Sequence, residues 1–349
     1  MKEQYIGLIG TYTDVGSEGI YSFILDSSVG KLNNVKLAGR IDGPTYLAID
    51  QSNQFVYAVA KEGNLGGIAS FKWEEDSQEL QEISRQLTEG TTPCYVNVNR
   101  SNTTVVSAYY HRGTFESHMT NEKGELIERT SEIVQEGSGP VPKRQEHPHA
   151  HYLDFTPDEK FVIGIDLGTD EVITFQLNNH RLEVKNRLKV KPGSGPRHLV
   201  FHPNGKYAYC LTELSNEVIV LKYHEDGTFT EVQYMSTVPD DFNEESYGSA
   251  IQFSPDGCFL YAGNRGHNSI AVFSVDSETG KIEYVDYTPV SGDWPRDFTL
   301  DPSGEFVIVA NQNSNNLVLF KRNAKTGKLI LLQSDISVSK PVCVKFFHK

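Results

Sequence analysis

Short alternating apolar runs recur along this chain, separated by turns rich in Gly, Pro, Asn and Asp. Residues 198–201, 207–211, 217–223 and 229–235 illustrate the pattern, since each run is rich in Val, Ile, Tyr and Phe and is bounded by turn residues. Such runs are typical of β-strands. No long apolar pattern with the 3.6-residue period of a helix competes with them. The segment therefore predicts four strands joined as a meander.

The four-strand unit repeats seven times. Each unit opens with Pro or Gly, continues as an alternating strand and turns through a Pro/Asp-Gly type sequence into a second strand. The openings lie at Pro44, Pro93, Pro148, Pro196, Gly248, Pro295 and Pro341. The steps between them are 49, 55, 48, 52, 47 and 46 residues, close to the repeat of a four-stranded propeller blade.

The two ends of the chain complement each other. After Pro341 only one strand remains, residues 342–347, and it would leave an unpaired sheet edge. The first two strand-like runs, 5–10 and 19–25, resemble second and third strands of a blade. The sequence thus predicts an all-β, seven-bladed propeller of four-stranded antiparallel blades. Its ring is closed by N-terminal strands that complete the C-terminal blade, in a single domain over residues 1–349.

Composition narrows the range of partners. The formal net charge of -14 and pI of about 5.3 argue against nucleic acid or an anionic membrane as a partner. Residues 1–13 hold Lys2, Glu3 and an apolar run too short for a signal peptide or a membrane span, so we expect a cytoplasmic location.

The four cysteines lack CxxC spacing, and we expect free, at least partly buried thiols with no nucleophilic role. The oligomeric state stays open.

Equivalent positions in the blades share a structural task, so departures from the common residue type are informative. One residue after the opening, the chain has Thr45, Cys94, His149, Arg197, Ser249, Arg296 and Val342. Seventeen residues after it, the chain has Lys61, Tyr110, Ile165, Glu213, Arg265 and Gln312. Because a hairpin returns the second strand beside the first, both positions are predicted to lie at one mouth of the central channel.

Arginine is the most frequent charged residue at this predicted mouth. Its planar fork suits carboxylate or phosphate, so several arginines facing one cavity predict a small anionic ligand. The alternative is that each arginine pairs with a local acid such as Glu213 or Asp297 and only braces the ring.

Three histidines alternate at His147, His149 and His151. Alternate residues of a strand share a face, so the three imidazoles could hold a metal. Pro148, however, leaves His147 in the preceding loop, and we therefore expect no metal and no other cofactor. His149 is instead predicted to bind substrate or to act in catalysis. His151 aligns with apolar residues of the other blades and is predicted to be a satisfied core residue.

Several segments at this mouth resemble one known family. They are Arg144-Gln145 with His147-Pro148-His149-Ala150-His151, then Gly195-Pro196-Arg197-His198, Thr212-Glu213-Leu214-Ser215-Asn216, Asn264-Arg265-Gly266-His267-Asn268 and Pro295-Arg296-Asp297-Phe298. The chain resembles the seven-bladed lactonase family, which includes propeller-type bacterial 6-phosphogluconolactonases and fungal carboxymuconate cyclases. The resemblance implies that His149, Arg197, Glu213 and Arg265 are catalytic. The expected substrate-binding residues around them are Arg296, His198, Asp297, Arg144, Gln145, His147 and Asn264.

The implied reaction is hydrolysis of 6-phosphogluconolactone to 6-phosphogluconate, a step of the pentose phosphate pathway. Opening a lactone needs an activated water and stabilisation of the tetrahedral oxyanion. His149 or Glu213 is the expected base, one arginine stabilises the oxyanion and the others bind the phosphate. Two alternatives stay open, a muconate-type cycloisomerase and a binding propeller without chemistry. The gathering of unusual residues at the channel mouth favours an enzyme.

Overall fold

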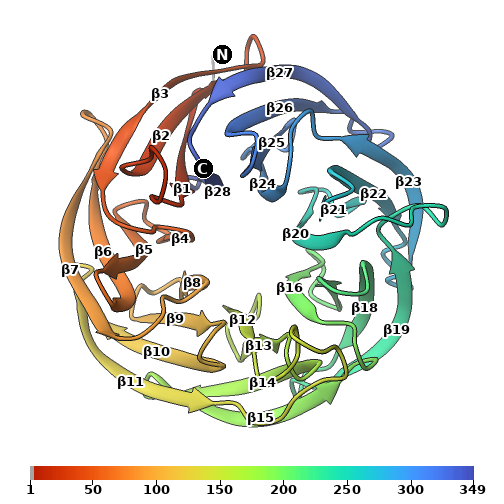
Figure 1. Ribbon diagram of the computed structural model, residues 1–349, viewed down its shortest axis with the longest axis horizontal. Coiled ribbons are helices and arrows are strands. Elements are labelled where there is room, and N and C mark those ends of the chain that lie inside the picture. Colours follow the sequence, from red (N-terminus) through yellow and green to blue (C-terminus); the bar gives the residue numbers. More distant parts are fainter. Residues whose placement is uncertain (1–3) are drawn as a thin grey trace.

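Seven four-stranded antiparallel sheets form a ring around a central channel (Figure 1). The computed structural model describes residues 4–349. The first blade along the chain consists of β4 (Leu47–Ile49), β5 (Phe55–Glu62), β6 (Leu65–Glu74) and β7 (Glu79–Glu89). The second consists of β8 (Tyr95–Val98), β9 (Thr104–Tyr109), β10 (Thr114–Thr120) and β11 (Leu126–Val134). The next two consist of β12 (Ala150–Phe155), β13 (Val162–Asp166), β14 (Glu171–Asn178), β15 (Arg181–Lys189), and β16 (Pro196–Phe201), β17 (Tyr207–Thr212), β18 (Glu217–Tyr223), β19 (Phe229–Ser236).

The remaining blades complete the ring. Two of them consist of β20 (Tyr247–Phe253), β21 (Phe259–Arg265), β22 (Ser269–Val275), β23 (Ile282–Pro289), and β24 (Pro295–Leu300), β25 (Phe306–Asn311), β26 (Asn316–Arg322), β27 (Leu329–Ser337). The last combines β28 (Pro341–Phe346) with β1 (Gln4–Thr11), β2 (Gly19–Asp26) and β3 (Lys31–Arg40). The predicted seven-bladed architecture is confirmed. Within residues 4–349, no helix has the length and hydrophobicity that crossing a bilayer requires.

The two ends of the chain close the ring by sharing one blade, as the sequence predicts. That blade has the strand order β28-β1-β2-β3, and Figure 1 shows β1 lying beside β28 there. In its antiparallel register Ile9 faces Val344, and both side chains are fully buried. The C-terminal strand thereby gains a partner for the edge it would otherwise expose.

Neighbouring blades pack through buried apolar side chains and a few hydrogen bonds. Tyr209 in β17 is fully buried, and its hydroxyl donates to the Gly280 carbonyl of the next blade over 2.6 Å. Gly280 has φ +73°, and a Cβ there would lie 2.4 Å from the ring of Tyr207. The turn therefore needs glycine both for its backbone angle and for its close approach to the adjacent blade. Such contacts hold the first strands at fixed positions around the channel.

A β-bulge near the start of the first strand turns selected side chains toward the channel. In β16, Pro196 pairs with Thr212 and His198 with Leu211, which leaves Arg197 unpaired between them. Arg296 occupies the same place in β24. A bulge bends the strand and redirects the side chain of the extra residue. The hairpin thus brings the end of the second strand beside an arginine that faces the mouth.

The third blade departs from the predicted register by two residues. Its bulge lies at His151, because Ala150 pairs with Asp166 and Tyr152 with Ile165. The prediction that Pro148 opens this blade is therefore wrong: Ala150 occupies the place of Pro196, and His151 that of Arg197. The distance from the start of the strand to its turn was the sequence signal for the correct register. Phe155 lies five residues after Ala150, as Phe201 does after Pro196.

The four cysteines are free thiols, as the sequence predicts. Cys210 and Cys343 are buried and Cys94 is half-buried, but Cys258 is exposed. The expectation that every thiol is at least partly buried is wrong for Cys258, because it follows the Asp256-Gly257 turn at the surface.

Candidate active site

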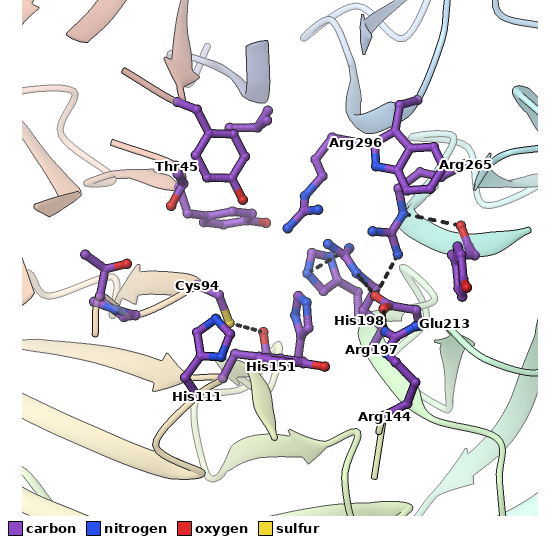
Figure 2. A pocket seen from close by; sticks show the side chains of 18 residues that line it. Thr45, Cys94, His111, Arg144, His151, Arg197, His198, Glu213, Arg265 and Arg296 are labelled. Atoms are coloured by element: carbon purple, nitrogen blue, oxygen red, sulfur yellow. Dashed lines mark hydrogen bonds and ion pairs between the residues drawn. The ribbon is translucent and has the colours of Figure 1, made fainter. Parts of the chain in front are cut away.

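One mouth of the channel holds a cavity of about 460 Å³ (Figure 2). Its wall combines aromatic rings, imidazoles and guanidinium groups contributed by all seven blades. The lining residues are Tyr12, Thr45, Tyr46, Thr92, Pro93, Cys94, Tyr110, His111, Arg144, His151, Arg197, His198, Glu213, Tyr247, Arg265, Trp294, Arg296 and Val342. Glu213 is the one carboxylate among them, against four arginines.

Glu213 lies at the centre of the cationic side of the cavity (Figure 2). Its Oε2 accepts from Arg265 Nη2 at 2.6 Å and from Arg197 Nε at 3.0 Å, and its Oε1 accepts from Arg144. Burial disfavours the charged form of Glu213, but the charges of Arg265 and Arg197 outweigh burial and hold its pKa well below 4.5. The carboxylate is therefore ionised, with both oxygens engaged.

Backbone carbonyls at the start of β20 fix the same two buried arginines. Arg265 donates to the Gly248 carbonyl at 2.7 Å, and Arg197 donates to the Ser249 carbonyl. Burial lowers the pKa of Arg265 to about 9, with Glu213 the main opposing influence, so this guanidinium stays charged at neutral pH. The arginines are thus held rigidly before any ligand arrives.

Arg296 differs from the other three arginines. Among residues 4–349 it forms no hydrogen bond or ion pair, and Figure 2 shows its guanidinium extending into the cavity. The alternative in which each arginine only braces the ring therefore describes Arg144, Arg197 and Arg265, which share Glu213, but not Arg296. Asp297, suggested as a bracing acid, accepts instead from the Val344 amide at 2.9 Å.

His151 lies on the cavity wall rather than in a satisfied core position. It is 4 % exposed, and its Nδ1 has no hydrogen-bond partner within residues 4–349. Burial and the nearby Arg197 charge lower its pKa well below 6.5, so the imidazole is neutral and able to accept a proton. The prediction that His151 is a satisfied core residue is wrong, because the bulge turns its side chain into the channel.

His149 lies behind the wall. Its ring stacks on Tyr110 with the centroids 4.2 Å apart and the planes 18° from parallel. Its Nδ1 donates to the Tyr110 carbonyl over 3.1 Å, and burial lowers its pKa. Tyr110 lines the cavity and His149 does not. The convergence of His149 on the mouth, expected from the sequence, is therefore not observed.

Four other expected substrate-binding residues also lie outside the lining. Gln145 is buried and donates to the Leu167 carbonyl at 2.8 Å, while Asn264 donates to the Thr237 carbonyl at 2.6 Å. His147 is half-exposed, and Asp297 is buried below the cavity. Their polar atoms hold loops and strand ends together. The structure does bring together Arg144, Arg197, His198, Glu213, Arg265 and Arg296.

A layer of rings crosses the channel beneath the cavity. Tyr46 and Tyr95 lie 4.4 Å apart between centroids, Tyr95 and Tyr152 lie 4.6 Å apart, and His198 packs against all three. Tyr46 and His198 line both this cavity and a second one of about 330 Å³ below it. The layer therefore forms the floor of the candidate active site.

Cys94 also reaches the wall, and its environment excludes a nucleophilic role. Its Sγ lies within 3.6 Å of the Ala108 and Ala150 carbonyl oxygens, to which it can donate. Burial raises the pKa of this thiol to about 12. A protonated thiol is a weak nucleophile.

Trp294 was missed by the sequence analysis although the repeat marks it. It adopts φ +66° immediately before an opening proline, where Gly43 and Gly195 have φ +62° and +58°. A bulky residue in this left-handed region is strained, and such strain gathers at functional sites. The indole lies 5.6 Å from the Arg265 guanidinium and helps to wall the cavity. Tryptophan at a position that is glycine in two other blades was the available signal.

Comparison with known proteins identifies the family. The family model described as lactonase, 7-bladed beta-propeller, matches residues 6–346. The chain belongs to this family. It is 45% identical over 347 residues, 99% of each chain, to the 6-phosphogluconolactonase of Bacillus subtilis.

Two solved structures have the same fold over nearly their whole length. A Lactobacillus plantarum protein is 40% identical with a TM-score of 0.95, and 99% of each chain is covered. The periplasmic gluconolactonase of Pseudomonas aeruginosa is 29% identical with a TM-score of 0.93, again over 99% of each chain.

Replacing Glu213 by Gln is expected to destabilise the fold by about 3–5 kcal/mol, because it leaves three guanidinium groups without a counter-charge. The matched change Glu62→Gln, at an exposed ion pair with Arg85, should cost under about 1 kcal/mol. The pKa of Glu213 is lower in the folded chain, so its stabilisation is complete above pH 4.5 and declines as the pH falls below that value. Urea unfolding of both variants across pH measures this, and equal losses at pH 7 would contradict it.

The backbone strain at Trp294 predicts an unusual order of stability for two variants. Trp294→Gly and Trp294→Ala both remove the ring, but only Gly adopts positive φ without strain. The Gly variant should therefore be the more stable by about 1 kcal/mol. At Val342, which lacks a positive φ, the order should reverse and Ala should be the more stable. Denaturant midpoints of the four variants test this. The same order of Gly and Ala stability at both positions would contradict a strained backbone at Trp294.

Proposed function

We propose that this protein hydrolyses a sugar lactone, namely 6-phosphogluconolactone, to 6-phosphogluconate in the pentose phosphate pathway. The observation that carries the proposal is the cavity lined by four guanidinium groups and one carboxylate, with Arg296 unpaired within the described residues 4–349. A phosphorylated lactone supplies the missing negative charge. The names of the Bacillus subtilis and Pseudomonas aeruginosa relatives, a 6-phosphogluconolactonase and a gluconolactonase, support this substrate class.

The unpaired guanidinium is the proposed phosphate anchor. Among residues 4–349 no partner takes the donors of Arg296, whereas Arg197 and Arg265 already give some of theirs to Glu213 and to backbone carbonyls. A guanidinium fork binds two phosphate oxygens at once. Because Arg197 and Arg265 are buried and fixed, they suit a reacting carbonyl whose charge develops only in the transition state. One of them is the proposed oxyanion donor.

His151 is the proposed general base. Glu213 is a poor base, since its pKa is well below 4.5 and both oxygens accept from arginine. The neutral imidazole of His151, which lines the cavity, takes a proton from water, and the hydroxide oxygen bonds to the lactone carbonyl carbon. When the ring C–O bond breaks, the imidazolium returns the proton to the leaving oxygen. No metal or cofactor takes part in this sequence.

Substituting Arg296 separates recognition of phosphate from recognition of the sugar ring. Arg296→Met should raise KM for 6-phosphogluconolactone about tenfold or more, because a charge-assisted hydrogen-bond pair is lost. KM for gluconolactone, which lacks the phosphate, should change little. The matched change Arg181→Met, at an exposed arginine of β15, should affect neither. Initial rates above the spontaneous background test this, and equal losses on both lactones would remove Arg296 from the phosphate site.

The two candidate imidazoles make different kinetic predictions. His151→Asn should lower kcat about 100-fold with KM nearly unchanged, while His149→Asn should lower it far less. Because the pKa of His151 is depressed, wild-type kcat/KM should stay flat from pH 8 to pH 6.5 and fall only at lower pH. Steady-state kinetics across pH decides this, and the opposite ranking of the variants would return the base to His149.

The same assays address the remaining alternatives. A muconate-type dicarboxylate as substrate tests for a cycloisomerase, and tight binding of 6-phosphogluconate without turnover of the lactone would indicate a binding propeller. The cytoplasmic location and the lack of nucleic-acid or membrane partners stay predictions from the sequence.

A further inference from the structure

A second cluster of chemically active side chains lies behind the cavity wall, in the segment that precedes β12. His147 Nε2, His149 Nε2 and a carboxylate oxygen of Glu146 converge so that all three atoms lie within 4.8 Å of one another. From the sequence, no metal site is expected here. The side-chain geometry leads to a different conclusion.

The buried imidazole has an unused ligand atom that faces this cluster. The side chain of His149 is 3% exposed, and its Nε2 has no hydrogen-bond partner in the described chain. An orphaned buried polar atom is costly unless something binds it. Glu146 Oε1 lies 3.7 Å from this Nε2 and 3.8 Å from His147 Nε2, too far for a hydrogen bond to either.

These separations suit an ion placed between the three groups. With bonds of about 2.0–2.1 Å, tetrahedral ligands of Zn²⁺ lie about 3.3 Å apart. Small side-chain shifts would bring Glu146 and the two imidazoles to that spacing. Glu146 and His147 are each about half-exposed, so the groups can move and an ion can enter from solvent.

In both rings the nitrogen that would not bind the metal, Nδ1, already has a hydrogen-bond partner. His147 Nδ1 lies 2.8 Å from the Pro148 carbonyl oxygen, and His149 Nδ1 lies 3.1 Å from that of Tyr110. A carbonyl only accepts, so each Nδ1 carries the proton and each Nε2 presents a lone pair. In metal-binding histidines, a hydrogen bond from the ring nitrogen that does not bind the metal fixes the tautomer in the same way.

We propose that Glu146, His147 and His149 form a binding site for a divalent transition metal of the Zn²⁺ class, with solvent completing the coordination. Two imidazoles and one carboxylate favour such an ion over Mg²⁺ or Ca²⁺, which take oxygen ligands. The site is distinct from the proposed lactonase chemistry, because none of its three ligands lines the cavity.

The position of the ion gives it a structural task. His149 stacks on Tyr110, a residue of the cavity wall, and the same segment carries Arg144, which pairs with Glu213. A bound ion would join Glu146 and His147 to His149, whose ring stacks on the wall. It would therefore stabilise the segment that places Arg144 at the mouth.

Calorimetric titration of untagged, chelator-stripped protein with ZnCl₂ tests the proposal. One Zn²⁺ should bind per chain, and Glu146→Gln and His147→Asn should each weaken binding by about tenfold or more. His224→Asn, at a half-buried histidine in another blade, and Cys258→Ser, at the exposed thiol, are the matched controls and should bind as the wild type does. Zn²⁺ should also raise the Tm of the wild type and of both controls, but not that of the two ligand variants.

The outcomes separate a metal site from an ion pair between Glu146 and protonated histidines. Absence of one-to-one binding, or binding unchanged in both ligand variants, would overturn the proposal. Circular dichroism confirms that each variant is folded, and anomalous diffraction at the zinc edge locates the ion independently of any substitution. Anomalous density elsewhere, with none between these three residues, would also overturn the proposal. The proposed lactonase function can fail without affecting these results, since the assay uses Zn²⁺ alone.

Discussion

The buried ionic cluster around Glu213 is the interaction on which the candidate site depends. Isolated buried charges are costly, so a carboxylate and several guanidinium groups persist at a channel mouth only when their geometry satisfies one another. Glu213 accepts from Arg144, Arg197 and Arg265, and the two buried arginines also donate to backbone carbonyls. The cluster leaves an excess of positive charge that only an anionic ligand can balance.

The propeller fold brings the residues of this cluster together and holds them at fixed distances. Each blade presents the start of its first strand and the end of its second at the same mouth, so residues from different blades meet around one axis. Closure of the ring by β28 and β1 fixes the distances between them (Figure 1). Arg197 lies in β16, Glu213 directly follows β17 and Arg265 ends β21 of the next blade, yet the three residues form one network (Figure 2). Rigid positioning of this kind is the basis of electrostatic preorganisation.

The repeat also explains where sequence reasoning succeeded and where it failed at the site. In the fourth and sixth blades the opening prolines lie directly before the bulged arginines, so counting from them located Arg197 and Arg296 correctly. In the third blade Pro148 lies two residues before the true opening, and the count selected His149 instead of His151. A two-residue shift preserves the strand's alternation of faces. For that reason the hydrophobic pattern could not reveal the error, whereas the turn that follows Phe155 could.

By itself, the sequence determined the architecture, the closure of the ring and the arginine-rich mouth, because strand alternation, turn residues and repeat spacing are local properties. The tertiary structure decided which polar groups already have partners. Only there is Arg296 seen to lack a partner among residues 4–349, and only there do the arginines hold the pKa of Glu213 too low for a good base. Only there, too, does Trp294 occupy a strained backbone position against Arg265. Pairing, burial and bulges arise from contacts between distant segments. Their energies depend on three-dimensional distances that the order of residues does not contain.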